Sequence, residues 1–116
     1  MRDVLLQCSG LAAIAVAVFH GVIGEFKVFP RMSIEPQRLR TLIRLVWQAS
    51  TVAWIGGGVL LVAAPWMQSD SARHWIVVTL ACVFAFAALA NAWATRGRHF
   101  GWMALSAVVA LAVAGY

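Results

Sequence analysis

Two residues of types that could carry out chemistry stand close together near the end of the first apolar segment. His20 and Glu25 lie five residues apart in FHGVIGEFKVFPR (Phe19–Arg31), where a hydrophobic stretch gives way to a basic one. A histidine titrates near neutral pH and can carry a proton or bind a metal, whereas a carboxylate can bind a cation or pair with an arginine. Three interpretations follow: an active site, an ion path, or the polar end of a helix.

The composition decides which elements must position these residues. The chain has 116 residues, of which 63% are hydrophobic and 11% are charged, whereas about a quarter of a soluble domain is charged. The apolar residues fall into four blocks, without the alternation expected of membrane strands. A helix needs about 20 apolar residues to cross a bilayer. We therefore predict an all-α integral membrane protein, a single domain over residues 1–116 with four transmembrane helices at about 4–24, 36–66, 74–95 and 99–116.

The net charge of +5 is explained by topology. Basic residues concentrate in two of the connections between apolar blocks, namely Lys27, Arg31, Arg38 and Arg40 in the first and Arg96 and Arg98 in the last. Connections rich in lysine and arginine remain in the cytoplasm. This rule predicts a multi-pass inner-membrane protein with its N-terminus and C-terminus both non-cytoplasmic. The partner implied by these charges is the lipid bilayer, and no nucleic acid is needed to explain them.

A polar layer is predicted at a shared depth on the cytoplasmic side. Counting about 1.5 Å of rise per residue places His20 about 6 Å inside the inner boundary, level with Gln48 and Asn91. Polar groups in hydrocarbon usually face the bundle and find partners there. We expect Glu25 to pair with Arg44 or Arg40. The full set of candidate site residues is His20, Glu25, Arg40, Arg44, Gln48, Asn91 and Ser106.

Several interpretations of this layer remain open. It could only fix the register of the helices, or it could form an ion or proton path through His20. A metal site would draw on His20, Glu25 and His99, whose donor types are suitable. A single-histidine haem site is conceivable, but no cofactor is predicted. Because the chain has no H-E-x-x-H, G-x-S-x-G or P-loop motif, we do not expect an enzyme.

Small residues at a spacing of four occur in every predicted helix. Ala13, Ala17 and Gly21 form such a stripe in the first helix, and Ser106, Ala110 and Ala114 form one in the last. Stripes of this kind let membrane helices approach closely. They predict a tight bundle and are also compatible with a homo-oligomer.

Three segments carry a resemblance to known sequences. These are the H-x-x-x-G-E of His20, Gly24 and Glu25, the stretch LRTLIRLVWQASTVAWIG (39–56), and RGRHFGW (96–102). Together they resemble a set of small bacterial membrane proteins with four transmembrane helices. The resemblance implies the same topology in a bacterial inner membrane. Those proteins often have Trp-His where this chain has Trp47-Gln48, and this difference argues against a shared metal or haem role.

Two main classes of function follow from the sequence. The first is a small oligomeric channel or transporter for an ion or solute, in which His20 and Glu25 gate the path or carry protons. The second is a non-catalytic accessory or scaffold subunit of a larger membrane complex. A module that binds haem, a metal or a lipid ranks third.

Overall fold

Four α-helices and three short helical turns make up the protein. The computed structural model describes all 116 residues. The α-helices are α1 (Arg2–Ile23), α2 (Gln37–Ala63), α3 (Asp70–Thr95) and α4 (Gly101–Gly115). A π-helical turn (Gly24–Val28) and a 3₁₀ turn (Phe29–Arg31) extend α1, and a second 3₁₀ turn (Ala64–Trp66) extends α2. The helical segments Arg2–Arg31, Gln37–Trp66 and Asp70–Thr95 are long and apolar enough to cross a membrane, whereas α4 is apolar but shorter.

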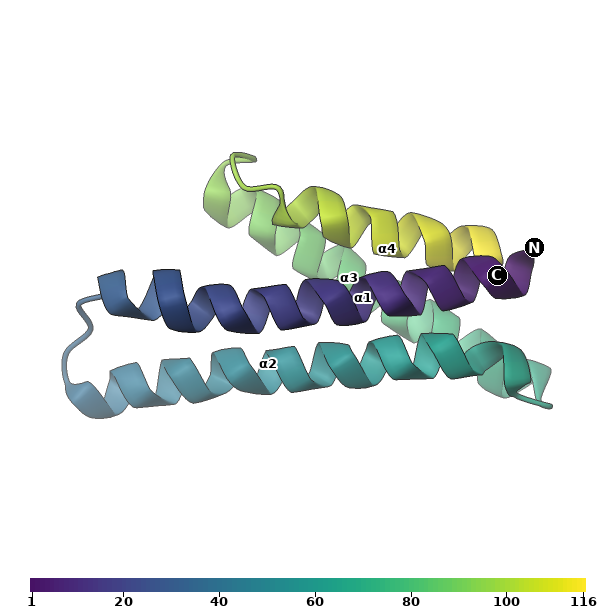
Figure 1. Cartoon of the computed structure of the whole chain (residues 1–116), viewed down its shortest axis with the longest axis horizontal. Helices are drawn as coiled ribbons and strands as arrows, with labels where there is room; N and C mark the ends of the chain where they lie inside the picture. The colour runs from purple at the N-terminus through teal and green to yellow at the C-terminus, as the bar shows by residue number, and fades with distance from the viewer.

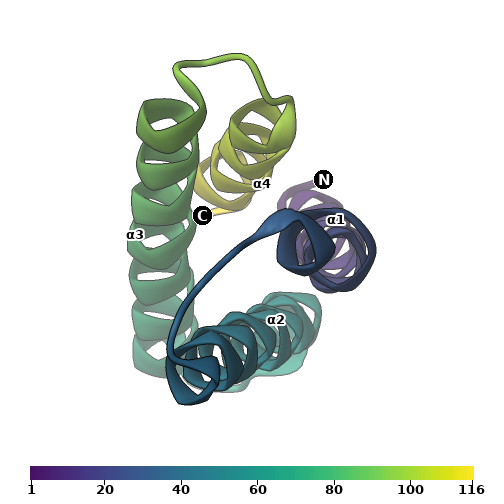
Figure 2. The same cartoon turned by 90° about the vertical axis from the view of Figure 1, so that its left-hand side faces the viewer.

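The helices do not form a regular parallel bundle. α1 packs against both α2 and α4, and α3 packs mainly against α4. α1, α2 and α4 run nearly side by side, while α3 lies steeply across them (Figure 1). Seen from the end that carries the α1–α2 connection, α3 lies close to α2 at one end and diverges from it toward α4 (Figure 2). The bundle is therefore least tightly closed between α2 and α3.

The two basic connections lie at the same end of the molecule. The α1–α2 connection and the turn between α3 and α4 lie at one end, and the α2–α3 turn and both chain ends lie at the other (Figure 1). This arrangement is the one that the charge distribution of the sequence requires if the basic connections share one side of a membrane.

The core is built from small and medium-sized apolar residues. A glycine on each of two helices lets α1 and α2 touch along their backbones, since a Cβ atom on Gly10 would lie 2.5 Å from the Gly58 carbonyl oxygen. The fully buried Ser9 donates a hydrogen bond of 2.7 Å to the carbonyl oxygen of Val108 and so links α1 to α4. The buried apolar side chains form one cluster: Leu6, Ala13, Leu61, Ala64, Val77, Phe84, Ala88, Leu105, Val108 and Ala112.

The small-residue stripes do not all face this core. Ala13, Ala17 and Gly21 are buried, as close approach of α1 and α2 requires. Ser106, Ala110 and Ala114 lie on the exposed face of α4. The buried face of α4 instead carries Leu105, Val108, Ala112 and Gly115.

Two helix boundaries differ from the predicted ones for identifiable reasons. α3 begins at Asp70 instead of residue 74, because the Ser69 hydroxyl accepts a hydrogen bond from the Ala72 N–H and caps the helix. α4 begins at Gly101 instead of residue 99, because Arg96 and Gly97 both adopt positive φ angles of 51° and 71° and end α3 in a left-handed turn. The predicted starts at 4 and 36 lie within two residues of the observed ones, Arg2 and Gln37.

Candidate functional site

An ion pair joins α1 to α2 at the end that carries the basic connections. The Arg44 guanidinium donates to Glu25 through Nε at 3.0 Å and through Nη2 at 2.5 Å, which is a two-point contact with both carboxylate oxygens. Gln48 Nε2 donates to Glu25 Oε1 at 2.8 Å and lies 3.2 Å from the Gly21 carbonyl oxygen. Glu25 therefore pairs with Arg44, one of its two expected partners. The other, Arg40, donates to the Phe29 carbonyl oxygen at 3.0 Å instead.

The backbone of α1 is shaped to receive α2 at this point. The π-helical turn Gly24–Val28 begins beside Glu25, and such turns often occur at functional sites. Gly24 allows the indole of Trp47 to lie directly against the helix, since a Cβ atom there would lie 2.3 Å from Trp47 Nε1. That indole N–H donates to the His20 carbonyl oxygen at 3.0 Å. The close contact thus fixes Trp47 in one orientation above α1.

His20 is held between aromatic rings. Its imidazole stacks on the Trp47 ring, with ring centroids 4.1 Å apart and an interplanar angle of 5°. The Trp54 ring is tilted by 37° against the imidazole, with ring centroids 4.7 Å apart. Its Nε2 lies 3.2 Å from the Ser50 hydroxyl, which itself donates to the Trp47 carbonyl oxygen at 2.6 Å. Because that hydroxyl uses its hydrogen on the carbonyl, the neutral imidazole donates through Nε2 and leaves Nδ1 as an acceptor without a protein partner.

A cavity of about 370 Å³ lies beside His20 and is partly open. All four helices contribute residues to it. Its walls are mostly apolar and rich in aromatic rings, a composition typical of sites for small hydrophobic molecules. The lining residues are Ala15, Val16, Phe19, His20, Ile23, Val28, Trp47, Trp54, Asn91, Thr95, His99, Phe100, Gly101, Ala104 and Leu105.

Asn91 provides the main unsatisfied polar group in this cavity. Its side-chain oxygen Oδ1 is buried and has no hydrogen-bond partner. A buried acceptor without a partner typically destabilises a protein by about 1–3 kcal/mol. Native structures usually avoid such groups, so each one that occurs needs an explanation. A ligand that donates a hydrogen bond would satisfy this oxygen.

His99 and Gly101 complete the polar end of the cavity. The Gly101 N–H donates to His99 Nδ1 at 3.1 Å, so the neutral His99 ring carries its hydrogen on Nε2. A Cβ atom on Gly101 would lie 2.8 Å from His99 Nδ1 and 3.2 Å from the Asn91 amide. A side chain at this position would therefore crowd both polar groups, and the glycine lets α4 begin beside them.

The predicted polar layer divides into two parts and loses one member. Glu25, Arg44 and Gln48 form the ion-pair cluster, and His20 and Asn91 face the cavity. Ser106 does not join either part. It is exposed, and its hydroxyl donates to the Trp102 carbonyl oxygen of its own helix at 2.8 Å, so it needs no partner in the bundle.

The three residues considered for a metal site do not gather. No group of three histidine, cysteine, aspartate or glutamate side chains lies close enough to hold a metal ion. Glu25 is bound to Arg44 and Gln48, while His20 and His99 line the cavity. The His20 Nε2 atom is already hydrogen-bonded to Ser50. The donor set therefore fits neither the metal site nor a haem ligated through this nitrogen.

Sequence reasoning missed most of the aromatic lining. A tryptophan inside an apolar helix, such as Trp47 or Trp54, gives no sign of the cavity beside it. A usable signal does exist in the sequence. Gly24 stands four residues after His20, so both lie on one face of a helix, and a glycine beside a histidine leaves room for a large ring from a neighbouring helix.

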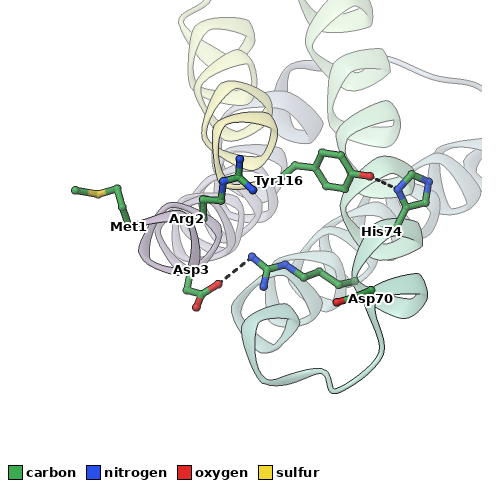
Figure 3. A pocket seen from close by; sticks show the side chains of 7 residues that line it. Met1, Arg2, Asp3, Asp70, His74 and Tyr116 are labelled. Atoms are coloured by element: carbon green, nitrogen blue, oxygen red, sulfur yellow. Dashed lines mark hydrogen bonds and ion pairs between the residues drawn. The ribbon is translucent and has the colours of Figure 1, made fainter.

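A second hollow of about 770 Å³ lies at the opposite end of the molecule (Figure 3). Its lining includes an ion pair of 2.9 Å between Arg73 and Asp3, and a hydrogen bond between His74 and Tyr116. These contacts tie α3 to the start of α1 and the end of α4. The two arginines and two aspartates that line the hollow cancel in charge, so it offers no field that selects an ion.

No family model matches the chain, and no curated protein or solved structure shows significant similarity to it. The function must therefore be inferred from the geometry of the cavity and of the ion-pair cluster.

Proposed function

We propose that this protein is a small bacterial inner-membrane module that binds a lipid-like molecule in the cavity beside His20. The observation that carries the proposal is that Asn91, whose buried side-chain oxygen has no partner, lines a cavity with mostly apolar and aromatic walls. Apolar walls suit a molecule that partitions into the bilayer. The polar group at one end would orient its headgroup.

The ion-pair cluster has a supporting role in this proposal. Glu25, Arg44 and Gln48 are engaged with one another and lie on α1 and α2 outside the cavity lining. They hold α1 and α2 together next to Trp47, whose indole forms part of the cavity wall. The cluster thus stabilises the wall without contacting the ligand.

A channel through a single chain finds less support. Toward the end opposite the basic connections, the fully buried Leu6, Leu61 and Val108 fill the interior of the bundle. The charged residues of that end line the open hollow at its surface. An ion path would therefore have to run between copies of the chain.

Native mass spectrometry of the detergent-purified protein tests the binding proposal. We expect a stoichiometric added mass in the range of a lipid-like molecule. Replacing Ala104 by leucine fills the cavity and should remove this mass, whereas Ala110→Leu on the exposed face of the same helix should retain it. A discrete multimer without added mass that conducts ions in proteoliposomes would refute the proposal and favour the channel.

The proposed topology places the basic connections in the cytoplasm and both termini outside, with α4 as a fourth, short span. Cysteine labelling tests it in a variant in which Cys8 and Cys82, the only cysteines, are replaced by serine. An impermeant maleimide added to intact cells should label Gln68→Cys in the α2–α3 turn. It should label Ser33→Cys in the basic connection only after permeabilisation. The opposite pattern would reverse the orientation.

A further inference from the structure

The polar groups and the walls of the cavity indicate which chemical class of molecule it binds. This inference rests on the proposed binding function. We infer that the cavity takes a hydroxylated aromatic ring with an alkyl or isoprenoid tail, as in a membrane quinol. The ring hydroxyl donates to Asn91 Oδ1, and the apolar tail extends toward the surrounding lipid. The assignment depends on the polar groups at one end of the cavity and on the shape of its walls.

The polar end requires a donor. Asn91 Oδ1 is a buried acceptor that no protein group reaches. The His99 Nε2–H is a donor without a protein acceptor, because Nδ1 of the same ring accepts the Gly101 N–H. Asn91 and His99 both line this end of the cavity. A ligand hydroxyl beside the Asn91 amide can donate its hydrogen to the unpartnered oxygen.

The walls favour a flat ring over a flexible chain. Six aromatic side chains line the cavity: Phe19, His20, Trp47, Trp54, His99 and Phe100. The pair formed by Phe19 and Phe100 has ring centroids 5.2 Å apart, and His20 is fixed flat against Trp47. Aromatic rings pack well against one another in tilted and stacked arrangements. A ring-shaped headgroup can use these walls, whereas a fatty acid would offer them only a chain.

No charged side chain is placed to bind the headgroup of a ligand in the cavity. The carboxylate of Glu25, just after α1, is bound to Arg44 and Gln48. No lysine, arginine, aspartate or glutamate lines the cavity. An anionic headgroup would therefore enter without a countercharge, which is unfavourable in an apolar site. A neutral hydroxyl meets no such penalty.

The test measures binding of three probes to the protein in lipid nanodiscs. The probes are 2-decylhydroquinone, its dimethyl ether, which cannot donate a hydrogen bond, and decanoic acid. Quenching of tryptophan fluorescence reports binding because Trp47 and Trp54 line the cavity. We expect the hydroquinone to bind at least about tenfold more tightly than the ether, as one hydrogen bond to a buried acceptor would give. We also expect it to bind more tightly than the acid.

Two variants and one control variant separate the ligand class from the binding function itself. Asn91→Leu should reduce the preference for the hydroquinone over the ether to near unity while the ether still binds. Ala104→Leu should weaken all three probes, and Ala110→Leu should weaken none. If the hydroquinone and the ether bind equally to the native protein, or if decanoic acid binds most tightly, the ligand class is wrong although the cavity binds. If no probe binds, the proposed function itself fails.

Discussion

Replacing Gly24 by alanine should test how the wall of the cavity is built. The added Cβ atom would lie 2.3 Å from Trp47 Nε1, whereas ordinary contacts begin at 3.4 Å. The indole must therefore move by the difference, about 1.1 Å if it moves directly away. Its hydrogen bond to the His20 carbonyl oxygen, now 3.0 Å long, would then exceed the normal range of about 2.7–3.2 Å.

The expected loss of stability combines two effects. Overpacking typically destabilises a protein by about 1–3 kcal/mol, and the loss of one hydrogen bond adds about 1 kcal/mol. Gly24→Ala should therefore lower the free energy of unfolding by about 2–4 kcal/mol. The loss can be measured by unfolding in mixed micelles of dodecylmaltoside and sodium dodecyl sulphate, followed by circular dichroism. Gly56→Ala is the matched control, because nothing lies within 4 Å of a Cβ atom at that position.

A double-mutant cycle shows whether Trp47 is the cause. In a Trp47→Phe background the smaller ring removes the atom that clashes and also the N–H that bonds His20. Gly24→Ala should then cost less than half of what it costs in the native background. An unchanged penalty in both backgrounds would refute the argument, since the clash would have to lie elsewhere. A penalty equal to that of Gly56→Ala would refute it as well.

Two further predictions concern the contacts that join the helices. Ser9→Ala should destabilise the protein by about 1 kcal/mol, because it removes a fully buried hydrogen bond to α4, whereas Ser106→Ala on the exposed face should change stability by less than about 0.5 kcal/mol. The same micelle titration measures both, and equal effects would contradict the assignment of Ser9 to the interior. Exchanging the charges of Glu25 and Arg44 should restore much of the thermal stability that either single reversal removes, as measured by melting in detergent. No recovery in the double variant would show that the pair does not couple α1 to α2.

The sequence predicts the helices well because its apolar blocks are long and are separated by charged or turn-forming residues. The ends depend on local chemistry that a block of apolar residues hides. Ser69 caps α3 and moves its start to Asp70, within a stretch that looks like part of a polar connection. A glycine such as Gly97 is typical of a turn after a helix, but nothing in the sequence marks Arg96 beside it for a positive φ.

The cavity was less predictable because it depends on the relative placement of the helices. In a membrane protein both faces of a helix are apolar, so hydrophobic periodicity does not separate the buried face from the lipid-facing one. Trp54 lines the cavity while Trp93 is 88% exposed, and nothing in their immediate sequence distinguishes them. α3 crosses the other helices steeply (Figure 2), so the two tryptophans have different surroundings, and that crossing cannot be read from any one helix.

Polar residues carry the information that hydrophobicity lacks, but only some of them do so reliably. A serine or threonine hydroxyl can donate to the carbonyl oxygen four residues earlier, as Ser106 and Thr41 do, and is then satisfied on any face of its helix. Gln48 and Asn91 have side-chain amides with several donor and acceptor sites, and one local bond leaves others open. Gln48 finds its partners on α1. Asn91 leaves one oxygen unpaired. The asparagine and glutamine positions of such a helix are therefore better guides to its interior face than its serines, and an amide that finds no partner within the bundle marks the place where a ligand is needed.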